Sequence, residues 1–220
     1  MKKLLPFLFL LIPLSLFATS SSFQVGAKVG MTKNTINAGE NYRNYKYSTR
    51  PGFKAEIPVI YQINSHFALE SGIALTAKNY KLERSSQQNM INLTIEDLFI
   101  SIPLAINLIL PWNNVYSNYL SLGGYLGWWC WSKSTGEVVD INRNTQDVTE
   151  EGDLSLKNRL EYGLLLAVGS TFDLTDNFRL AVALEYEHDL SSLNKTQQHG
   201  AYPIYNRTLL VTTSLLWSLK

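Results

Sequence analysis

The feature that most constrains this sequence is an alternation of apolar and polar residues with a period of two. Between Phe178 and Tyr186 every second residue is apolar, and the residues between them are small or charged. The last segment, from Leu209 to Leu219, repeats this alternation. Successive side chains of a β-strand point to opposite faces, so each segment predicts a strand with one apolar face.

Eight segments of the chain follow this pattern, and none shows a convincing helical period. They span residues 23–31, 53–61, 67–78, 98–108, 120–128, 160–168, 178–189 and 209–219. Each is long enough to cross a bilayer as a tilted strand, which takes about 9–11 residues. Pro103 interrupts the fourth segment, and because proline cannot donate a ladder hydrogen bond we expect a β-bulge there.

The connections between these segments alternate in length. Those at 63–65, 111–114 and 173–176 are short, whereas those at 33–49, 82–93, 132–154 and 190–204 are long. Short periplasmic turns and long extracellular loops are typical of outer-membrane barrels, and a soluble sandwich would not be expected to sort its loops this way. The sequence therefore predicts an all-β fold, an eight-stranded antiparallel up-and-down transmembrane β-barrel with both termini in the periplasm.

Aromatic residues, 12% of the chain, gather at the ends of the predicted strands. Those at the short-turn end are Phe23, Tyr61, Phe67, Trp112, Tyr116, Phe172, Phe178 and Trp217. Those at the long-loop end are Phe53, Tyr80, Trp128, Trp129, Trp131, Tyr186 and Tyr205. Aromatics cluster at strand ends in any β protein, but here they flank runs of Leu, Ile and Val on one parity, which predicts two membrane-interface girdles.

The N-terminus carries the pattern of a secretory signal peptide. A positive start, Met1-Lys2-Lys3, precedes an apolar run of about 14 residues and then the small residues Ala18-Thr19-Ser20. The run is shorter than the roughly 20 residues of a membrane-spanning helix, which argues against an uncleaved anchor. We expect residues 1–20 to be removed, after Ser20 or after Ala18, so that residues 21–220 form one barrel domain in the cell outer membrane.

Composition excludes several other classes of protein. Only 17% of residues are charged and the formal net charge is +1, so a disordered chain and a basic surface for nucleic acid are both excluded. The single cysteine, Cys130, permits no internal disulfide and no multi-cysteine zinc site.

The predicted inward faces of the strands carry five cations and five anions. These residues are Lys28, Lys54, Glu56, Glu70, Lys78, Arg159, Glu161, Arg179, Glu185 and Glu187. Eight strands enclose a space that side chains just fill, so we interpret this set as a structural ion-pair network. A proton or ion path is the alternative interpretation.

No residues are predicted to be catalytic, cofactor-binding or metal-binding. The three histidines lack metal-ligand spacing, and the acidic segment at 147–153 lacks the residue order of an EF-hand loop. A lipid-modifying barrel enzyme would need a catalytic cluster at the outer rim, where His188, Asp189, Ser191 and Ser192 are the candidates. His188 and Asp189 are consecutive in a strand and are expected to face opposite ways. A narrow channel is a further alternative.

Several segments resemble the small outer-membrane barrels of Bacteroidetes, the PorT-like group. The opening strand, Phe23 to Gly30, resembles that group's Gly-x-Lys-x-Gly strand, and Phe99 to Leu104 resembles its mid-barrel Ile-Pro-Leu strand. The glycine-bearing strand at 122–127 and the strand, turn and strand at 164–184 fit as well. The resemblance implies a non-enzymatic role in envelope integrity, adhesion or support of secretion. Many outer-membrane proteins end on an aromatic residue, whereas here Trp217 is followed by three more residues.

A partner is expected at the long loops, because rigid scaffolds carry function on their loops. Besides outer-membrane lipid, the predicted partner is a protein or glycan that contacts loops 33–49 and 132–154. Residues 40–47 of the first loop are rich in tyrosine, which suits such contacts. An equally weighted alternative is that these tyrosines extend the strands above the membrane.

Overall fold

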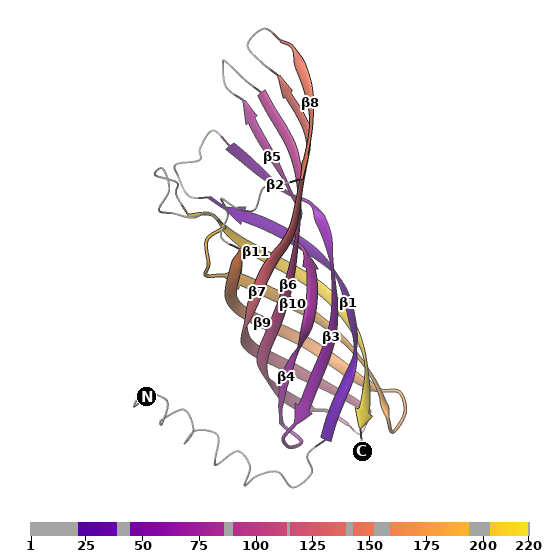
Figure 1. The fold of residues 1–220 in the computed structure, drawn as a ribbon. Coiled ribbons are helices and arrows are strands. Elements are labelled where there is room, and N and C mark those ends of the chain that lie inside the picture. Colours follow the sequence, from indigo (N-terminus) through magenta and orange to yellow (C-terminus); the bar gives the residue numbers. More distant parts are fainter. Residues whose placement is uncertain are drawn as a thin grey trace, which may run out of the picture.

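The structure is a computed structural model that describes residues 22–38, 45–85, 90–113, 115–139, 143–151, 159–193 and 203–219. These residues form one antiparallel sheet of eleven strands (Figure 1). The strands are β1 (Ser22–Asn37), β2 (Tyr45–Thr49), β3 (Pro51–Gln62), β4 (Phe67–Ala77), β5 (Tyr80–Ser85), β6 (Met90–Pro111), β7 (Tyr116–Val139), β8 (Thr145–Glu151), β9 (Leu160–Asp173), β10 (Phe178–Asp189) and β11 (Tyr205–Leu219).

Eight of these strands close into a ring, namely β1, β3, β4, β6, β7, β9, β10 and β11. Each pairs with the next in the chain, and β1 pairs with β11 along its whole length, from Phe23 opposite Leu219 to Asn37 opposite Tyr205. The predicted eight-stranded up-and-down barrel is therefore confirmed. Closure pairs both edges of every strand, as a membrane-embedded sheet requires.

The barrel exposes its apolar side chains and buries its polar ones, which is the reverse of a soluble core. On β11, Val211 is 58% exposed, whereas the neighbouring Thr212 is 1% exposed. The same alternation runs around all eight strands, so that a band of exposed Leu, Ile, Val and Phe side chains surrounds the barrel. An apolar surface of this extent marks contact with lipid.

The short turns that close one end of the barrel share a hydrogen-bonding device. Asn64 Oδ1 accepts hydrogen bonds from the backbone N–H groups of His66 and Phe67, at 2.8 and 2.9 Å. In the next short turn, Asn113 Oδ1 accepts from Val115 and Tyr116, at 2.9 and 2.7 Å. Such Asx turns satisfy backbone donors locally and fix a tight reversal between the strands.

The prediction of a β-bulge at Pro103 is wrong. Pro103 lies in register opposite Tyr125 of β7, and the pairing of β6 with β4 is instead interrupted between Ser71↔Leu104 and Ala74↔Ser101. Proline has no backbone N–H to donate, and the edge of Pro103 that lacks this donor faces β4. There the Ser71 hydroxyl donates to the Pro103 carbonyl at 2.9 Å. The register between β6 and β7 shifts instead between Leu98 and Phe99, where Cys130 is an extra residue on β7.

A five-stranded extension stands beyond the barrel at the end opposite the short turns (Figure 1). It consists of the far halves of β6 and β7, with β5 and β2 added on one side and β8 on the other. Much of the predicted long loops at 33–49, 82–93 and 132–154 is therefore strand, which corrects the sequence-based interpretation. The extension lies at the long-connection end of the barrel, which is the extracellular end in outer-membrane barrels.

The alternation of apolar and polar residues inverts where the chain leaves the membrane. The pattern of a membrane strand therefore does not identify the strands of the extension. Within the barrel, outward residues of β6 such as Ile100 are apolar and exposed. In the extension, the same face carries Asn92, Thr94 and Glu96, and the opposite face carries Ile91, Leu93 and Ile95. The outer face changes from lipid to water at this level, so its side chains change from apolar to polar.

The predicted signal segment, residues 1–20, lies outside the described residues, and the limits of the barrel domain stay a prediction. No helix in the part of the chain that the structure describes is long and apolar enough to cross a membrane.

Candidate functional site

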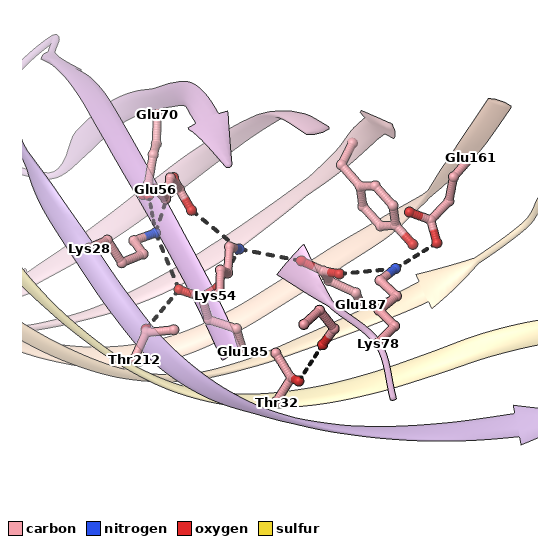
Figure 2. A network of polar contacts seen from close by, with 12 residues as sticks. Lys28, Thr32, Lys54, Glu56, Glu70, Lys78, Glu161, Glu185, Glu187 and Thr212 are labelled. Atoms are coloured by element: carbon pink, nitrogen blue, oxygen red, sulfur yellow. Dashed lines mark hydrogen bonds and ion pairs between the residues drawn. The ribbon is translucent and has the colours of Figure 1, made fainter. Parts of the chain in front are cut away.

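The lumen of the barrel is filled by a chain of ion pairs built on three buried lysines, Lys28, Lys54 and Lys78 (Figure 2). Lys28 Nζ lies 2.7 Å from Glu70, 3.2 Å from Glu185 and 3.5 Å from Glu56. On the side nearest the short turns, the amide of Asn107 donates to Glu70 at 2.8 Å. The ion-pair network therefore ends here at a neutral side chain, Asn107.

Lys54 occupies the middle of the network and contacts three carboxylates. Its Nζ lies 3.0 Å from Glu185, 3.2 Å from Glu56 and 3.3 Å from Glu187. The hydroxyl of Thr212 donates to the other oxygen of Glu185 at 2.9 Å. Because Glu56 and Glu185 each contact both Lys28 and Lys54, the two lysines belong to one network rather than to separate pairs.

Lys78 occupies the end of the network nearest the extension. Its Nζ lies 2.6 Å from Glu161, 3.3 Å from Asp189 and 3.4 Å from Glu187, so Glu187 links it to Lys54. The hydroxyl of Tyr125 donates a hydrogen bond to Asp189. With Asn107 on β6, Tyr125 on β7 and Thr212 on β11, all eight strands of the ring contribute a side chain to this network.

The predicted inward set is largely correct, and the structure adds Asp189 to it. The prediction that Arg159 faces inward is wrong, because this residue precedes β9 and is exposed. Arg179 lies near the short-turn end of the lumen, apart from the network, and pairs with Asp173 through Nη2 at 3.2 Å. Asp189 was not among the predicted inward residues, although the alternation places it on the same face as Glu185 and Glu187.

An apolar cluster caps the lumen where the barrel meets the extension. Its buried members are Ile36, Ala38, Tyr80, Ile95, Phe99, Trp129 and Leu193. The rings of Phe99 and Trp129 stack with their centroids 5.4 Å apart, and each side chain is 1% exposed. Lys78 Nζ lies 5.2 Å from the Phe99 centroid, so this cap covers the last lysine of the network directly.

Two aromatics predicted for the outer girdle are thus interior, namely Tyr80 and Trp129. Trp129 faces inward because it continues the alternation of Tyr125 and Gly127, and the irregularity at the next residue lets Cys130 and Trp131 both lie on exposed positions. Trp128 and Trp131 remain outside, at 50% and 37% exposure, and fit the predicted girdle. A one-residue irregularity changes the face of every later side chain, and the sequence alternation alone does not locate it.

The cavities within the described lumen are small. One of about 40 Å³ lies between Lys28, Tyr119 and Arg179 near the short turns. A second of about 10 Å³ lies beside Glu56 and Glu70. A water molecule needs roughly 10–15 Å³ measured in this way, so the first of these two spaces has room for a few waters and the second for about one.

The candidate enzyme residues do not converge. Asp189 is buried against Lys78, whereas His188 lies on the outer side, where its Nδ1 is 3.3 Å from the hydroxyl of Tyr186. Ser191 Oγ accepts from the backbone N–H of Tyr162 at 2.9 Å, and Ser192 Oγ accepts from that of Ile204 at 3.1 Å. Both serine hydroxyls thus accept hydrogen bonds from backbone N–H groups at the rim.

Metal-ligating side chains do not gather in groups of three or more among the described residues. Asp147, Glu150 and Glu151 of the acidic segment are exposed on β8, while Asp153 lies outside the described residues. Cys130 is an exposed thiol on β7.

The two segments predicted to bind a partner form opposite edges of the extension, through β2 and β8. Two tyrosines of the first segment pack against the sheet. Arg84 lies 4.9 Å from the ring centroid of Tyr45 and donates to its hydroxyl, and Tyr47 lies 6.2 Å from the ring of Tyr80. For these two tyrosines the structure favours the alternative that they extend a strand. Residues 40–44 lie outside the described residues.

Comparison with known families matches residues 17–195 to the outer membrane protein beta-barrel domain. This match covers well over half of the chain. The chain belongs to the outer membrane protein beta-barrel domain family. Membership, together with the apolar band, places it in the outer membrane in contact with lipid. No curated protein sequence matches the chain significantly.

Solved structures of outer-membrane barrels share the fold. The outer membrane protein OprG from Pseudomonas aeruginosa is 12% identical, with 91% of this chain and 96% of that chain covered and a TM-score of 0.57. A major outer membrane protein from Thermus thermophilus is 9% identical, with 91% and 100% covered and a TM-score of 0.51. The attachment invasion locus protein Ail of Yersinia pestis is 14% identical, with 88% and 97% covered and a TM-score of 0.43. At these identities the likeness is one of fold alone.

Proposed function

We propose that this family member is a non-enzymatic, non-conducting barrel that anchors its extracellular extension, and that the extension binds a protein or glycan at the cell surface. The observation that carries the proposal is the division of the chain into a filled barrel and a sheet beyond it. The lumen is occupied by the Lys28, Lys54 and Lys78 network and capped by the Phe99 and Trp129 stack. A filled lumen offers neither a passage nor a substrate pocket.

The outer face of the extension supports a role in binding. Strand β8 is an edge strand whose polar side chains are exposed, and edge strands present backbone groups to other chains. Glu137 of β7 lies directly opposite Asp147 of β8, which gives this part of the face an unbalanced negative charge. Like charges opposite each other cost stability, so we infer that the face is kept acidic for a cationic group on the partner.

The finer assignment to PorT-like barrels of Bacteroidetes is part of this proposal. It is supported by the opening strand, Phe23 to Gly30, and by the Pro103 strand, whose proline the barrel accommodates without a bulge. The proposed biological settings are those that this resemblance implies, namely envelope integrity, adhesion or support of a secretion complex.

Photo-crosslinking in intact cells tests the binding role. A photoreactive residue in place of Thr149, which is exposed on the same face of β8 two residues from Asp147, is expected to give a discrete protein or glycan adduct. The matched control replaces Val168, which faces lipid on β9 and is 56% exposed, and is expected to give lipid adducts alone. Absence of any adduct at position 149 in cells that display the folded protein would contradict the proposal.

A shortened variant removes the acidic tip of the β7 and β8 hairpin and leaves the barrel intact. Thr135 and Thr149 are directly paired, so residues 136–148 can be replaced by Asn-Gly, which favours a two-residue hairpin turn. This variant should keep its heat-dependent shift in gel mobility, a property of folded small barrels, and lose partner binding.

The rival functions are tested separately. A steady conductance in planar bilayers would favour a channel, and reduced lipid acylation in outer membranes that carry His188→Ala would favour an enzyme.

A further inference from the structure

The barrel wall forks between β1 and β2, just above the apolar band. β3 pairs with β1 up to Lys33 opposite Pro51, whereas β2, which precedes β3 in the chain, pairs with β5 and joins the extension. β1 instead continues along β11 as far as Asn37. This divergence opens a crevice of about 350 Å³ on the outside of the barrel, which we call the fork crevice.

The lower wall of the fork crevice is apolar and faces the membrane. It is formed by Met31 of β1 and by Leu209 and Val211 of β11, which are 67%, 42% and 58% exposed. Met31 lies directly opposite Val211 in the register of these strands. These side chains belong to the lipid-facing parity, so the lower wall suits a hydrocarbon chain.

The upper wall of the fork crevice is cationic. Lys33 and Arg50 line it, and Arg207 lies two residues beyond Leu209 on the same face of β11. All three side chains are exposed. Arg50 Nη1 donates to the neutral hydroxyl of Thr94 at 2.8 Å, and no carboxylate of the described residues forms an ion pair with it.

Two described carboxylates of the extension, Glu83 and Glu96, lie beside other cations. In the part of the chain that the structure describes, the ion pairs of the outer face of the extension join Glu83 to Lys46 and to Lys81. Glu96 faces Lys133 across the β6 and β7 pair. Three cations therefore surround one side of a crevice whose other side is hydrocarbon-like.

We propose that the fork crevice binds a phosphorylated lipid of the outer leaflet. The phosphate would lie among Lys33, Arg50 and Arg207, and an acyl chain would lie along Met31, Leu209 and Val211. A free phosphate would gain nothing from the apolar wall, and a neutral lipid would leave the cations without a partner. The proposal does not depend on the partner of the extension, since the crevice lies at the membrane surface.

Lipid selectivity in defined vesicles tests the proposal. The full-length protein is folded into phosphatidylcholine vesicles that contain a trace of spin-labelled phosphatidic acid or of spin-labelled phosphatidylcholine with the same chains. A basic side chain near an anionic headgroup contributes about 1 kcal/mol, or about fivefold in association. We expect the protein to prefer phosphatidic acid by about fivefold or more in the electron paramagnetic resonance spectrum.

Two matched double variants distinguish the fork crevice from a general cationic surface. Lys33→Gln/Arg207→Gln removes one lysine and one arginine from the crevice and should lower the preference at least about fivefold. Lys133→Gln/Arg159→Gln removes one lysine and one arginine from β7 and from the residue before β9, which do not line the crevice, and should change it less than about twofold. Equal losses in the two variants would overturn the proposal.

A third variant tests the acyl-chain wall without altering charge. Val211→Trp fills the crevice with a residue that membrane interfaces tolerate, and it should lower the preference for phosphatidic acid to that of the double variant. An unchanged preference would also overturn the proposal, because it would mean that the phosphate binds without the chain. The heat-dependent gel shift shows that each variant is folded.

Discussion

Replacing Lys54 by methionine tests whether the ion-pair network stabilises the barrel. The Lys54 side chain is 1% exposed, and its ammonium lies within 3.3 Å of three carboxylates from Glu56, Glu185 and Glu187. Methionine nearly conserves the volume and removes the charge, so the lumen stays filled. The change therefore isolates the electrostatic contribution of the central lysine.

The magnitude follows from the contacts that are lost and those that remain. At an effective dielectric constant near 20, each ion pair at roughly 3.2 Å contributes about 5 kcal/mol before desolvation is subtracted. Glu56 and Glu185 keep Lys28, and Glu187 keeps Lys78, so no carboxylate loses its last lysine. Removing one partner from a buried ion pair costs about 3–5 kcal/mol, and we expect about 3 kcal/mol here.

The assay is reversible urea unfolding from phosphatidylcholine vesicles, followed by tryptophan fluorescence and by gel mobility. The matched control is Lys81→Met, in which a lysine 2.8 Å from Glu83 is removed from the partly exposed face of the extension. Exposed ion pairs contribute about 1 kcal/mol or less, so this control should unfold almost as the wild type does. Equal stability of the two variants would refute a stabilising role for the network.

Three further predictions concern the cap, a turn and a surface carboxylate. Trp129→Ala removes the largest buried side chain of the cap and should lower the unfolding free energy by about 3–5 kcal/mol in the same assay. Asn113→Ala removes two acceptor contacts to backbone N–H groups and should cost about 1 kcal/mol there. The Lys81 ammonium, which hydrogen-bonds the Glu83 carboxylate, lowers the pKa of Glu83. Its stabilisation is present at neutral pH and is lost as the pH falls through that pKa, and Lys81→Met should raise the pKa in an NMR titration.

Most of the fold could be predicted from the sequence, because each strand residue of a small barrel meets either lipid or the lumen. Alternations such as Leu209 to Trp217 report that choice locally, without knowledge of any partner strand. The eight strands, the short turns and most of the inward charges followed from this pattern. The extension did not, since its strands reverse the parity that identifies a membrane strand.

The pairing of the charges could not be predicted. Glu187 contacts Lys54 and Lys78, which precede it in the chain by more than a hundred residues, and closure of the barrel brings β10 across the lumen from β3 and the end of β4. Trp131 is a similar case, because the irregularity that keeps it on the outer face depends on how β6 and β7 meet.

The sequence by itself determined which face of each membrane strand meets lipid, because hydrophobic burial in a bilayer acts on one residue at a time. The tertiary structure decided which lysine lies beside which carboxylate, where the lumen is capped and where the wall forks above Lys33. These features depend on strand register and on the point at which paired strands separate. Both are set by contacts between residues far apart in the chain, which a local pattern does not encode.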